Sequence, residues 1–257
     1  NLIKLKKELK IKSIFAYDTK NKVKFLGNDK NFIFTQNLKM AAEECDVAFI
    51  CVPTFLHNQT INKILKHTKC HFYIEKPLSS EIKDCFKTLK KIEKIKKKVG
   101  IGYMFVNHPL ILKTQSLIKQ NTIGKIIFAR AECGLYLPNW HPWEDYRKFY
   151  MAHKNQGGGV LLDTSHEINY LQRLFGNVKN VQGIVGKFSD LQITSDDLAL
   201  SILNFKKNNI IAHVHLDLLQ FERSRSFKII GAKGTIEGCL STNKLRIFNN
   251  NKKKWKE

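Results

Sequence analysis

The sequence YIEKPL at residues 73–78 places an acid and a lysine against a proline, directly after a strand-like apolar segment. The residues at 71–74 are typical of a short buried strand, and a helical pattern begins near Ser80. Two charged groups at the end of a buried strand are costly to keep there unless they have partners or a function. Glu75 and Lys76 are therefore the first candidates for a functional site.

Strand-like and helix-like segments alternate on both sides of this stretch. The strand patterns cover 12–17, 32–35, 46–52 and 99–105, and the helical patterns cover 40–45, 57–67 and 80–97. Such alternation favours an α/β fold with a doubly wound parallel sheet. Ligands of these sheets bind beyond the carboxyl ends of the strands. Asp18, Pro53-Thr54 and Glu75-Lys76 all follow strand patterns, so we expect them to converge.

Asp18 stands where a dinucleotide-binding unit carries the acid that binds ribose hydroxyls. In that unit the acid lies about 20 residues after a Gly-x-Gly-x-x-Gly turn, whereas 17 residues precede Asp18 and none is glycine. We therefore expect a fragment that lacks the first strand and the glycine-rich turn and is inactive by itself. The lysine-rich end, 252–257, has no closing element, so we expect a cut there too. The alternative is an Asp18 that only opens a turn.

Beyond Pro109 the alternating pattern gives way to short β-like segments. Helical patterns at 110–119 and 160–174 flank a strand pattern at 126–133. The remaining strand patterns lie near 181–187, 198–205, 210–218, 226–230, 235–239 and 244–248. A run of short strands without intervening helices favours an antiparallel sheet.

Composition limits the classes of protein to consider. Lysine and arginine number 44 against 22 acidic residues, a formal net charge of +22. Many lysines surround an Ile/Leu stripe at 83–98, so solvated helix faces explain the charge better than nucleic-acid binding, which stays an alternative. No apolar run suits a membrane span, and the N-terminus has no signal-peptide core. Six cysteines without a Cys-x-x-Cys pair suit reduced thiols in the cytoplasm.

Four motifs in this order resemble the Gfo/Idh/MocA family (glucose–fructose oxidoreductase, inositol dehydrogenase). They are VPT at 52–54 with His57, EKPL at 75–78, GYM at 102–104 with His108-Pro109 and IGK at 123–125, and GGGVLLD at 157–163 with His166 and Asn169. The resemblance implies a Rossmann NAD(P)-binding domain, residues 1–106, and an α/β domain, residues 107–257. The second domain is expected to have an open, largely antiparallel sheet through which members commonly form homo-oligomers.

The chain also departs from the family pattern in three places. It lacks the glycine-rich turn, and His166 follows Asp163 at a spacing of three positions, where many members have a spacing of four. Both spacings keep the two side chains on one helix face, so the pair can persist. Asn169 stands where members often carry an acid, which leaves the role of that position open.

The resemblance implies an NAD-dependent dehydrogenase of carbohydrate biosynthesis that acts on a secondary alcohol of a sugar or nucleotide sugar. Oxidising an alcohol needs a base for the hydroxyl proton and a donor that stabilises charge on the oxygen. Lys76 fits the donor, beside Pro77 in a cis bond, as the resemblance suggests. His166 fits the base, because histidine has an ordinary pKa of about 6.5, and Asp163 fits its support. The alternative is a non-catalytic sugar- or nucleotide-binding relative with the same fold.

The expected cofactor contacts come from the strand ends. Asp18 is expected to bind both hydroxyls of the adenosine ribose and to repel a 2′-phosphate, which favours NAD over NADP. Glu75 is expected at the nicotinamide ribose, and Lys76 is a further expected cofactor contact. Pro53-Thr54 and His57 complete the set, although His57 could simply cap or pack.

Within the aromatic loop at residues 136–147, the segment 140–147 is the feature most specific to a substrate. Trp140 offers an aromatic face for a sugar ring, Tyr103 is a second substrate candidate, and Arg147 can pair with a phosphate or carboxylate. The alternative is a packed loop or a dimer contact. The alternating residues His213, His215 and Asp217 share one strand face, and we expect a sheet-face cluster there and no metal.

Overall fold

The computed structural model describes residues 5–19, 31–206, 208–251 and 253–257, which form two compact units. Unit 1 comprises Asn1–Val52, Leu56–Ile74 and Ile82–Gly100. Unit 2 comprises Pro53–Phe55, Glu75–Glu81 and Ile101–Glu257. The short segments that follow two strands of unit 1 therefore belong to the same unit as the C-terminal half of the chain.

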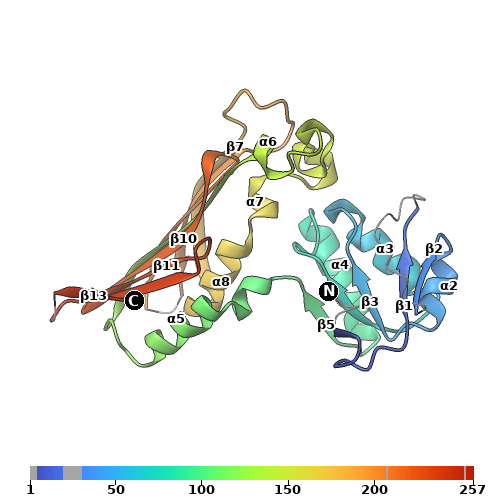
Figure 1. Cartoon of the computed structure of the whole chain (residues 1–257), viewed down its shortest axis with the longest axis horizontal. Coiled ribbons are helices and arrows are strands. Elements are labelled where there is room, and N and C mark those ends of the chain that lie inside the picture. The colour runs from blue at the N-terminus through green and yellow to red at the C-terminus, as the bar shows by residue number, and fades with distance from the viewer. Residues whose placement is uncertain (1–4, 20–30, 207, 252) are drawn as a thin grey trace. The chain divides into compact units, whose positions relative to one another are not determined.

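Unit 1 consists of short strands separated by helices (Figure 1). Its strands are β1 (Ile14–Tyr17), β2 (Phe32–Thr35), β3 (Val47–Ile50), β4 (His71–Ile74) and β5 (Val99–Ile101), and its helices are α2 (Leu38–Glu43), α3 (His57–Ile64) and α4 (Ile82–Lys94). β1 pairs with β2 and β3 pairs with β4, both in parallel, and β5 neighbours β4. Ile50 and Ile74 are buried on neighbouring strands. This parallel, helix-separated arrangement confirms the predicted fold class for the first half of the chain.

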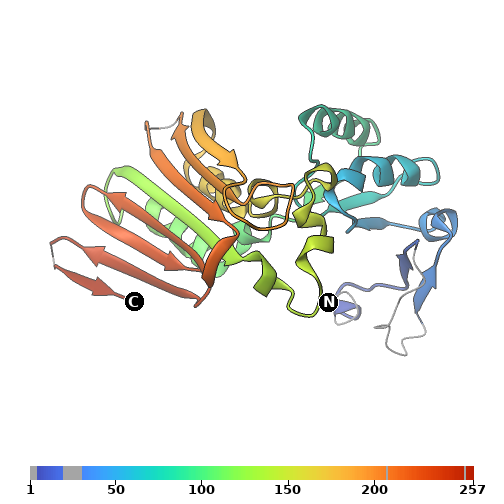
Figure 2. The ribbon, with the colours of Figure 1, turned by 90° about the horizontal axis from the view of Figure 1, so that it is seen from above.

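Unit 2 contains an eight-stranded sheet in the order β13-β12-β11-β10-β6-β9-β8-β7 (Figure 2). Its strands are β6 (Ile126–Tyr136), β7 (Val178–Gly186), β8 (Leu198–Phe205), β9 (Ile211–Asp217), β10 (Leu219–Gly231), β11 (Gly234–Cys239), β12 (Lys244–Asn249) and β13 (Lys254–Lys256). β6 and β9 pair in parallel, and the other neighbouring strands that the structure describes in this sheet pair antiparallel. The predicted open, largely antiparallel sheet is therefore confirmed.

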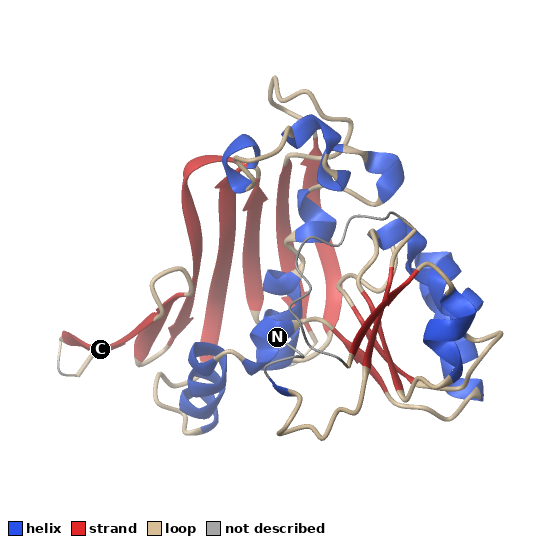
Figure 3. Ribbon diagram, turned by 45° about the vertical axis from the view of Figure 1, so that its right-hand side comes forward, coloured by secondary structure: helices blue, strands red, loops and turns tan. Residues whose placement is uncertain are grey.

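Helices α5 (Pro109–Lys119) and α8 (His166–Phe175) lie against one face of this sheet (Figure 3). His108 caps the start of α5: its Nδ1 accepts the Leu110 N–H at 3.3 Å, and Pro109 occupies the first helical position. Ala129 and Ala212, paired on β6 and β9, are fully buried beneath the helices, and their small side chains let the layers approach. No helix in the described ranges combines the length and apolarity that a membrane crossing needs.

The segment from β6 to α8 is mostly short helical turns. These are α6 (Leu137–Trp140), η3 (Tyr146–Lys148), η4 (Tyr150–Ala152), η5 (Lys154–Gln156) and α7 (Val160–Asp163); two further turns, η1 (Thr54–Leu56) and η2 (Met104–Asn107), follow β3 and β5. The sequence predicts one continuous helix over 160–174, but the chain breaks between α7 and α8. Thr164 Oγ1 donates to the Val160 carbonyl at 2.5 Å and Ser165 Oγ donates to the Leu162 carbonyl at 2.8 Å. Such side-chain hydrogen bonds compete with the helical ladder, which explains the break.

Candidate active site

Lys76 and Asp163 form a buried ion pair within unit 2, although 87 positions separate them in the sequence. Nζ of Lys76 lies 3.2 Å from Oδ1 of Asp163 and also donates to the carbonyl oxygen of the same residue. The two side chains are 15% and 7% exposed. Asp163 ends α7, so the helix break leaves its carbonyl available to the ammonium. Two oxygens of one residue therefore hold the ammonium in place.

Tyr150, in η4, is a further member of this cluster, and no sequence motif points to it. Its hydroxyl donates to Oδ1 of Asp163 at 2.5 Å, the oxygen that also faces Lys76. Burial, and then the charge of Asp163, raises the pKa of Tyr150 above its ordinary value. The phenol is therefore protonated at neutral pH and acts as a donor. In the sequence Tyr150 is one more aromatic residue after an aromatic loop, with no motif to single it out.

His166 is the first residue of α8 and is 7% exposed. The centroid of its ring lies 4.8 Å from that of Phe105 and 5.7 Å from that of Tyr103, with both pairs of rings nearly perpendicular. Burial, followed by the charges of Lys76 and Arg225, lowers the pKa of His166 to about 3. The imidazole is therefore neutral at neutral pH. The Asp163 carboxylate contacts Lys76 and Tyr150 rather than this imidazole among the hydrogen bonds of the described residues.

Two glycines allow the strand-end segments to pack closely within unit 2. A Cβ at Gly157, where φ is +74°, would lie 3.0 Å from the Cβ atoms of both Thr54 and Ser80. A Cβ at Gly102 would lie 2.9 Å from Oε2 of Glu75. Gly157 thus brings the glycine run before α7 against the η1 turn and the segment that carries Lys76. Thr54 is buried there, whereas Glu75 is exposed.

The remaining predicted cofactor residues have different settings. Asp18 directly follows β1 and is exposed, and Pro53 is half-buried. His57 is 1% exposed, and its Nε2 lies 2.9 Å from the Val52 carbonyl oxygen, so it fastens the end of one strand to the start of α3. An accessible carboxylate at the end of a parallel strand has the chemistry to bind ribose hydroxyls. The residues present therefore fit the adenosine end of NAD.

Trp140 and Arg147 make their described contacts within the aromatic loop and its surroundings. Trp140 stacks on His141 with a centroid distance of 5.6 Å. Nε of Arg147 lies 2.8 Å from Oδ1 of Asp145, and Nη1 lies 3.1 Å from Oε1 of Gln192. Arg147, which the sequence assigns to an anionic substrate, thus already has a carboxylate partner two positions away.

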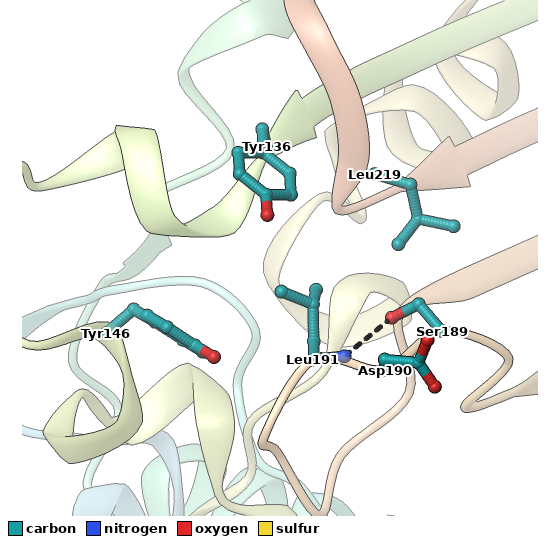
Figure 4. A pocket seen from close by; sticks show the side chains of 6 residues that line it. All are labelled: Tyr136, Tyr146, Ser189, Asp190, Leu191 and Leu219. Atoms are coloured by element: carbon teal, nitrogen blue, oxygen red, sulfur yellow. Dashed lines mark hydrogen bonds between the residues drawn. The ribbon is translucent and has the colours of Figure 1, made fainter.

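A cavity of about 370 Å³ opens beside this loop (Figure 4). Its lining combines two aromatic, two aliphatic and two polar side chains: Tyr136, Tyr146, Leu191, Leu219, Ser189 and Asp190. The Ser189 hydroxyl accepts the Leu191 N–H at 3.2 Å, which orders one wall. Tyr136 opens the aromatic loop, but the sequence gives no signal that residues 189–191 face it.

The predicted cluster on β9 has a structural explanation. Nε2 of His215 lies 2.8 Å from Oδ2 of Asp217, whose Oδ1 accepts the N–H groups of Leu219 and Gln220 at 2.8 and 3.0 Å. These contacts close the turn from β9 to β10. Within the described ranges, no group of three or more His, Cys, Asp or Glu side chains is placed to hold a metal ion.

Two family models match the chain in tandem. A model described as an oxidoreductase family with an NAD-binding Rossmann fold matches residues 1–103. A model of the GFO/IDH/MocA C-terminal domain matches residues 111–237. Together they cover both units and most of the chain.

Curated relatives and solved structures agree with these models. 2,7-Anhydro-N-acetylneuraminate hydratase of Escherichia coli (strain K12) is 26% identical over 147 residues, 55% of this chain and 36% of the relative. D-xylose dehydrogenase of Paenarthrobacter nicotinovorans is 26% identical over 141 residues, 53% of this chain and 35% of the relative. The matches thus span about a third of either relative. A levoglucosan dehydrogenase in complex with NADH and levoglucosan has a TM-score of 0.76 at 17% identity, over 87% of this chain and 64% of its own. The WlbA dehydrogenase from Bordetella pertussis, in complex with NADH and UDP-GlcNAcA, has a TM-score of 0.70 at 17% identity, over 81% and 59%.

Proposed function

Because this chain belongs to the Gfo/Idh/MocA family of NAD-binding oxidoreductases, we propose that it transfers a hydride between a sugar or nucleotide-sugar secondary alcohol and NAD. The observation that carries the proposal is the Lys76 ammonium, held by two oxygens of Asp163 in the same unit as a neutral, buried His166. Bound NAD supplies the hydride acceptor. The exposed carboxylate of Asp18 binds its adenosine ribose, and Glu75 and Thr54 contribute at the strand ends.

Lys76 is the electrophilic group of the proposed site. As the substrate hydroxyl loses its proton, negative charge develops on the oxygen, and a fixed ammonium stabilises that charge. Asp163 holds the ammonium in place before the reaction, so little reorganisation is needed. Tyr150 donates to the same carboxylate oxygen and limits its motion.

His166 is the proton acceptor of the proposed site. Its pKa of about 3 means that the imidazole is unprotonated at neutral pH, as a base must be. That value is low for a general base, since the most effective bases have a pKa near the working pH. Negative charge developing on a substrate oxygen beside the ring raises the pKa, because a nearby opposite charge favours the imidazolium.

The proposed function is tested by following NADH absorbance with a panel of sugars. The panel takes its members from the names of similar proteins, namely D-xylose, levoglucosan, myo-inositol and UDP-N-acetylglucosamine. In the full-length protein we expect NAD-dependent turnover of at least one sugar or nucleotide sugar, and we expect this turnover to be lost in Lys76→Ala and in His166→Ala. Unchanged turnover in both variants would contradict the assignment of these residues.

A redox-neutral reaction is a second candidate, because one relative at 26% identity is named a hydratase. Adding or removing water changes no net oxidation state, so NADH would not accumulate even though the sugar is converted. Following the sugar by NMR at a substoichiometric concentration of NAD separates the two. Conversion without NADH favours the hydratase type, whereas conversion matched by NADH favours the dehydrogenase.

We also propose that copies of the chain associate through the sheet of unit 2. Ile184, Ile202 and Ile211 lie on β7, β8 and β9 and are 60%, 48% and 44% exposed, which is unusual for large apolar side chains. Light scattering on Ile202→Glu tests this proposal. We expect a smaller particle than for the unsubstituted protein, and an unchanged mass would contradict it.

A further inference from the structure

Arg225 on β10 and Glu167 on α8 form a second buried ion pair in unit 2. Nε of Arg225 lies 3.0 Å from Oε1 of Glu167, Nη2 lies 3.3 Å from Oε2, and the side chains are 11% and 0% exposed. Burial raises the pKa of Glu167 to about 7, and Arg225 opposes that shift. Replacing a buried ion pair by apolar residues is often neutral or stabilising, so stability alone is a weak reason for this pair.

The pair is connected to His166 through an aromatic ring. The guanidinium carbon of Arg225 lies 4.6 Å from the centroid of the Phe105 ring, an arrangement that attracts the cation to the ring face. The Phe105 ring in turn packs nearly perpendicular to the His166 imidazole, with centroids 4.8 Å apart. Glu167 directly follows His166 in the sequence. The series of contacts from Glu167 through Arg225 and Phe105 to His166 therefore begins and ends at the start of α8.

His166 depends on such packing because the usual means of orienting a histidine is missing. A reactive imidazole is commonly fixed by a hydrogen bond from its second nitrogen to a carboxylate or carbonyl. Nδ1 of His166 is buried and has no hydrogen-bond partner in the described part of the chain. The imidazole is therefore oriented by the rings of Phe105 and Tyr103.

We propose that Arg225 is a positioning residue for His166, which it orients through Phe105 while Glu167 holds the guanidinium in place. Arginine suits this role because its planar fork binds a carboxylate with its edge while its face stacks on an aromatic ring. Lysine supplies the same charge but has no planar group that can stack on the ring. The inference rests on the proposed function for the value of an oriented His166, but the orientation itself can be measured without a substrate.

The chain offers a matched control for this arrangement. Arg246 on β12 pairs with Glu237, with Nε 2.6 Å from Oε2, and its guanidinium carbon lies 4.4 Å from the centroid of the Trp255 ring. The chemistry is the same, but Arg246 is 52% exposed and its aromatic partner contacts no histidine among the described ring pairs. Arg246→Lys therefore reports the cost of the substitution alone.

The experiment compares Arg225→Lys, Phe105→Leu, the double variant and Arg246→Lys. In NMR spectra of the imidazoles, the His166 resonances, assigned with His166→Asn, should shift in the first three proteins and stay in place in the control. With an active substrate, Arg225→Lys and Phe105→Leu should each lower kcat by about tenfold with little change in KM, because small misplacements of a reacting group are costly. The double variant should lose no more than the larger single effect, since both changes break one chain of contacts.

Unshifted His166 resonances in Arg225→Lys would overturn the inference, as would a double variant whose loss is the product of the two single losses. If Arg225→Lys does not fold, as its thermal midpoint would show, Phe105→Leu decides, and unshifted resonances in that variant overturn the inference. Full activity of His166→Ala contradicts the proposed function but leaves the positioning of the ring standing. Loss of activity in His166→Ala with no effect of Arg225→Lys contradicts the positioning alone.

Discussion

Lys76 and Arg147 are two cations that the sequence places near a substrate, and the structure gives them opposite settings. Lys76 is 15% exposed and pairs with a carboxylate 87 positions away, whereas Arg147 is 54% exposed and pairs with one two positions away. Breaking a buried ion pair leaves one charge buried without its partner, which is costly, whereas an exposed ion pair contributes little to stability. The difference teaches that a cation marks a site through its distant, buried partner rather than through its charge.

Lys76→Ala should have the largest effect of the changes that test this comparison. It removes the group that stabilises the developing oxygen charge, and kcat should fall by about 1,000-fold, as when a fixed donor is removed from a reacting oxygen. Steady-state kinetics measure the fall, and NAD titration by fluorescence should show that the cofactor still binds. A kcat within threefold of the unsubstituted value would remove the contrast between the two cations.

Asp163→Asn should have the next largest effect. The amide keeps the size of the side chain, and its Oδ1 can still accept from the Tyr150 hydroxyl, but the charge that faces Lys76 is removed. We expect kcat to fall by about 100-fold, because the ammonium is no longer fixed before the reaction. The thermal midpoint should fall as well, and a variant with normal kinetics would show that the carbonyl oxygen alone holds Lys76.

Tyr150→Phe should have a smaller effect on stability and rate. It deletes one hydrogen bond to a buried carboxylate, and such bonds contribute about 1.5–3 kcal/mol. Denaturant unfolding measures that loss. Asp163 keeps Lys76, so kcat should fall less than in Asp163→Asn, and an equal fall would assign Tyr150 a direct part in the reaction.

Arg147→Ala should leave the free energy of unfolding almost unchanged, because exposed pairs contribute little. Its informative effect is on substrate binding. If the substrate carries a phosphate or carboxylate, KM should rise a few-fold because one charge-assisted hydrogen bond to the substrate is lost. The kcat should stay unchanged. A rise in KM for a neutral sugar of the same size would indicate a packing role for the loop.

The smallest change is expected in the protonation of His166 between about pH 5 and 8. Its folded-state pKa of about 3 lies below the ordinary 6.5, so the ring stays neutral from pH 8 down to about 5. The stability linked to this group is present above pH 6.5 and is lost as the pH falls toward 3, because the unfolded chain binds the proton first. NMR titration should show no His166 transition between pH 5 and 8, and a midpoint near 6.5 would show that the ring is solvated.

Much of the fold can be predicted from periodicity in the sequence. The predicted strand 198–205 coincides with β8, and alternation in the first half predicts the parallel pairs of unit 1. The split of the helix over 160–174 cannot be predicted in this way, because the apolar period continues through Thr164 and Ser165. It is their hydroxyl contacts to backbone carbonyls that end α7.

The candidate site is predictable only where motifs carry it. Motif order groups Lys76 with Asp163 and His166, but it says nothing about which oxygen of Asp163 meets the ammonium. Tyr150 and Arg225 have no motif in the sequence. The turns between β6 and α7 bring Tyr150 to the site, and the pairing of β10 with β6 positions Arg225. Both positions therefore depend on tertiary packing that local patterns do not encode.

The break between α7 and α8 also bears on protein engineering. Thr164 and Ser165 are poor helix formers, and a search for stabilising substitutions would replace them with residues that extend one helix across 160–175. In a continuous helix the Asp163 carbonyl would accept a backbone hydrogen bond of that helix instead of the hydrogen bond from the Lys76 ammonium. The two residues that look easiest to improve are thus the two that a thermostabilised design of this chain should leave unchanged.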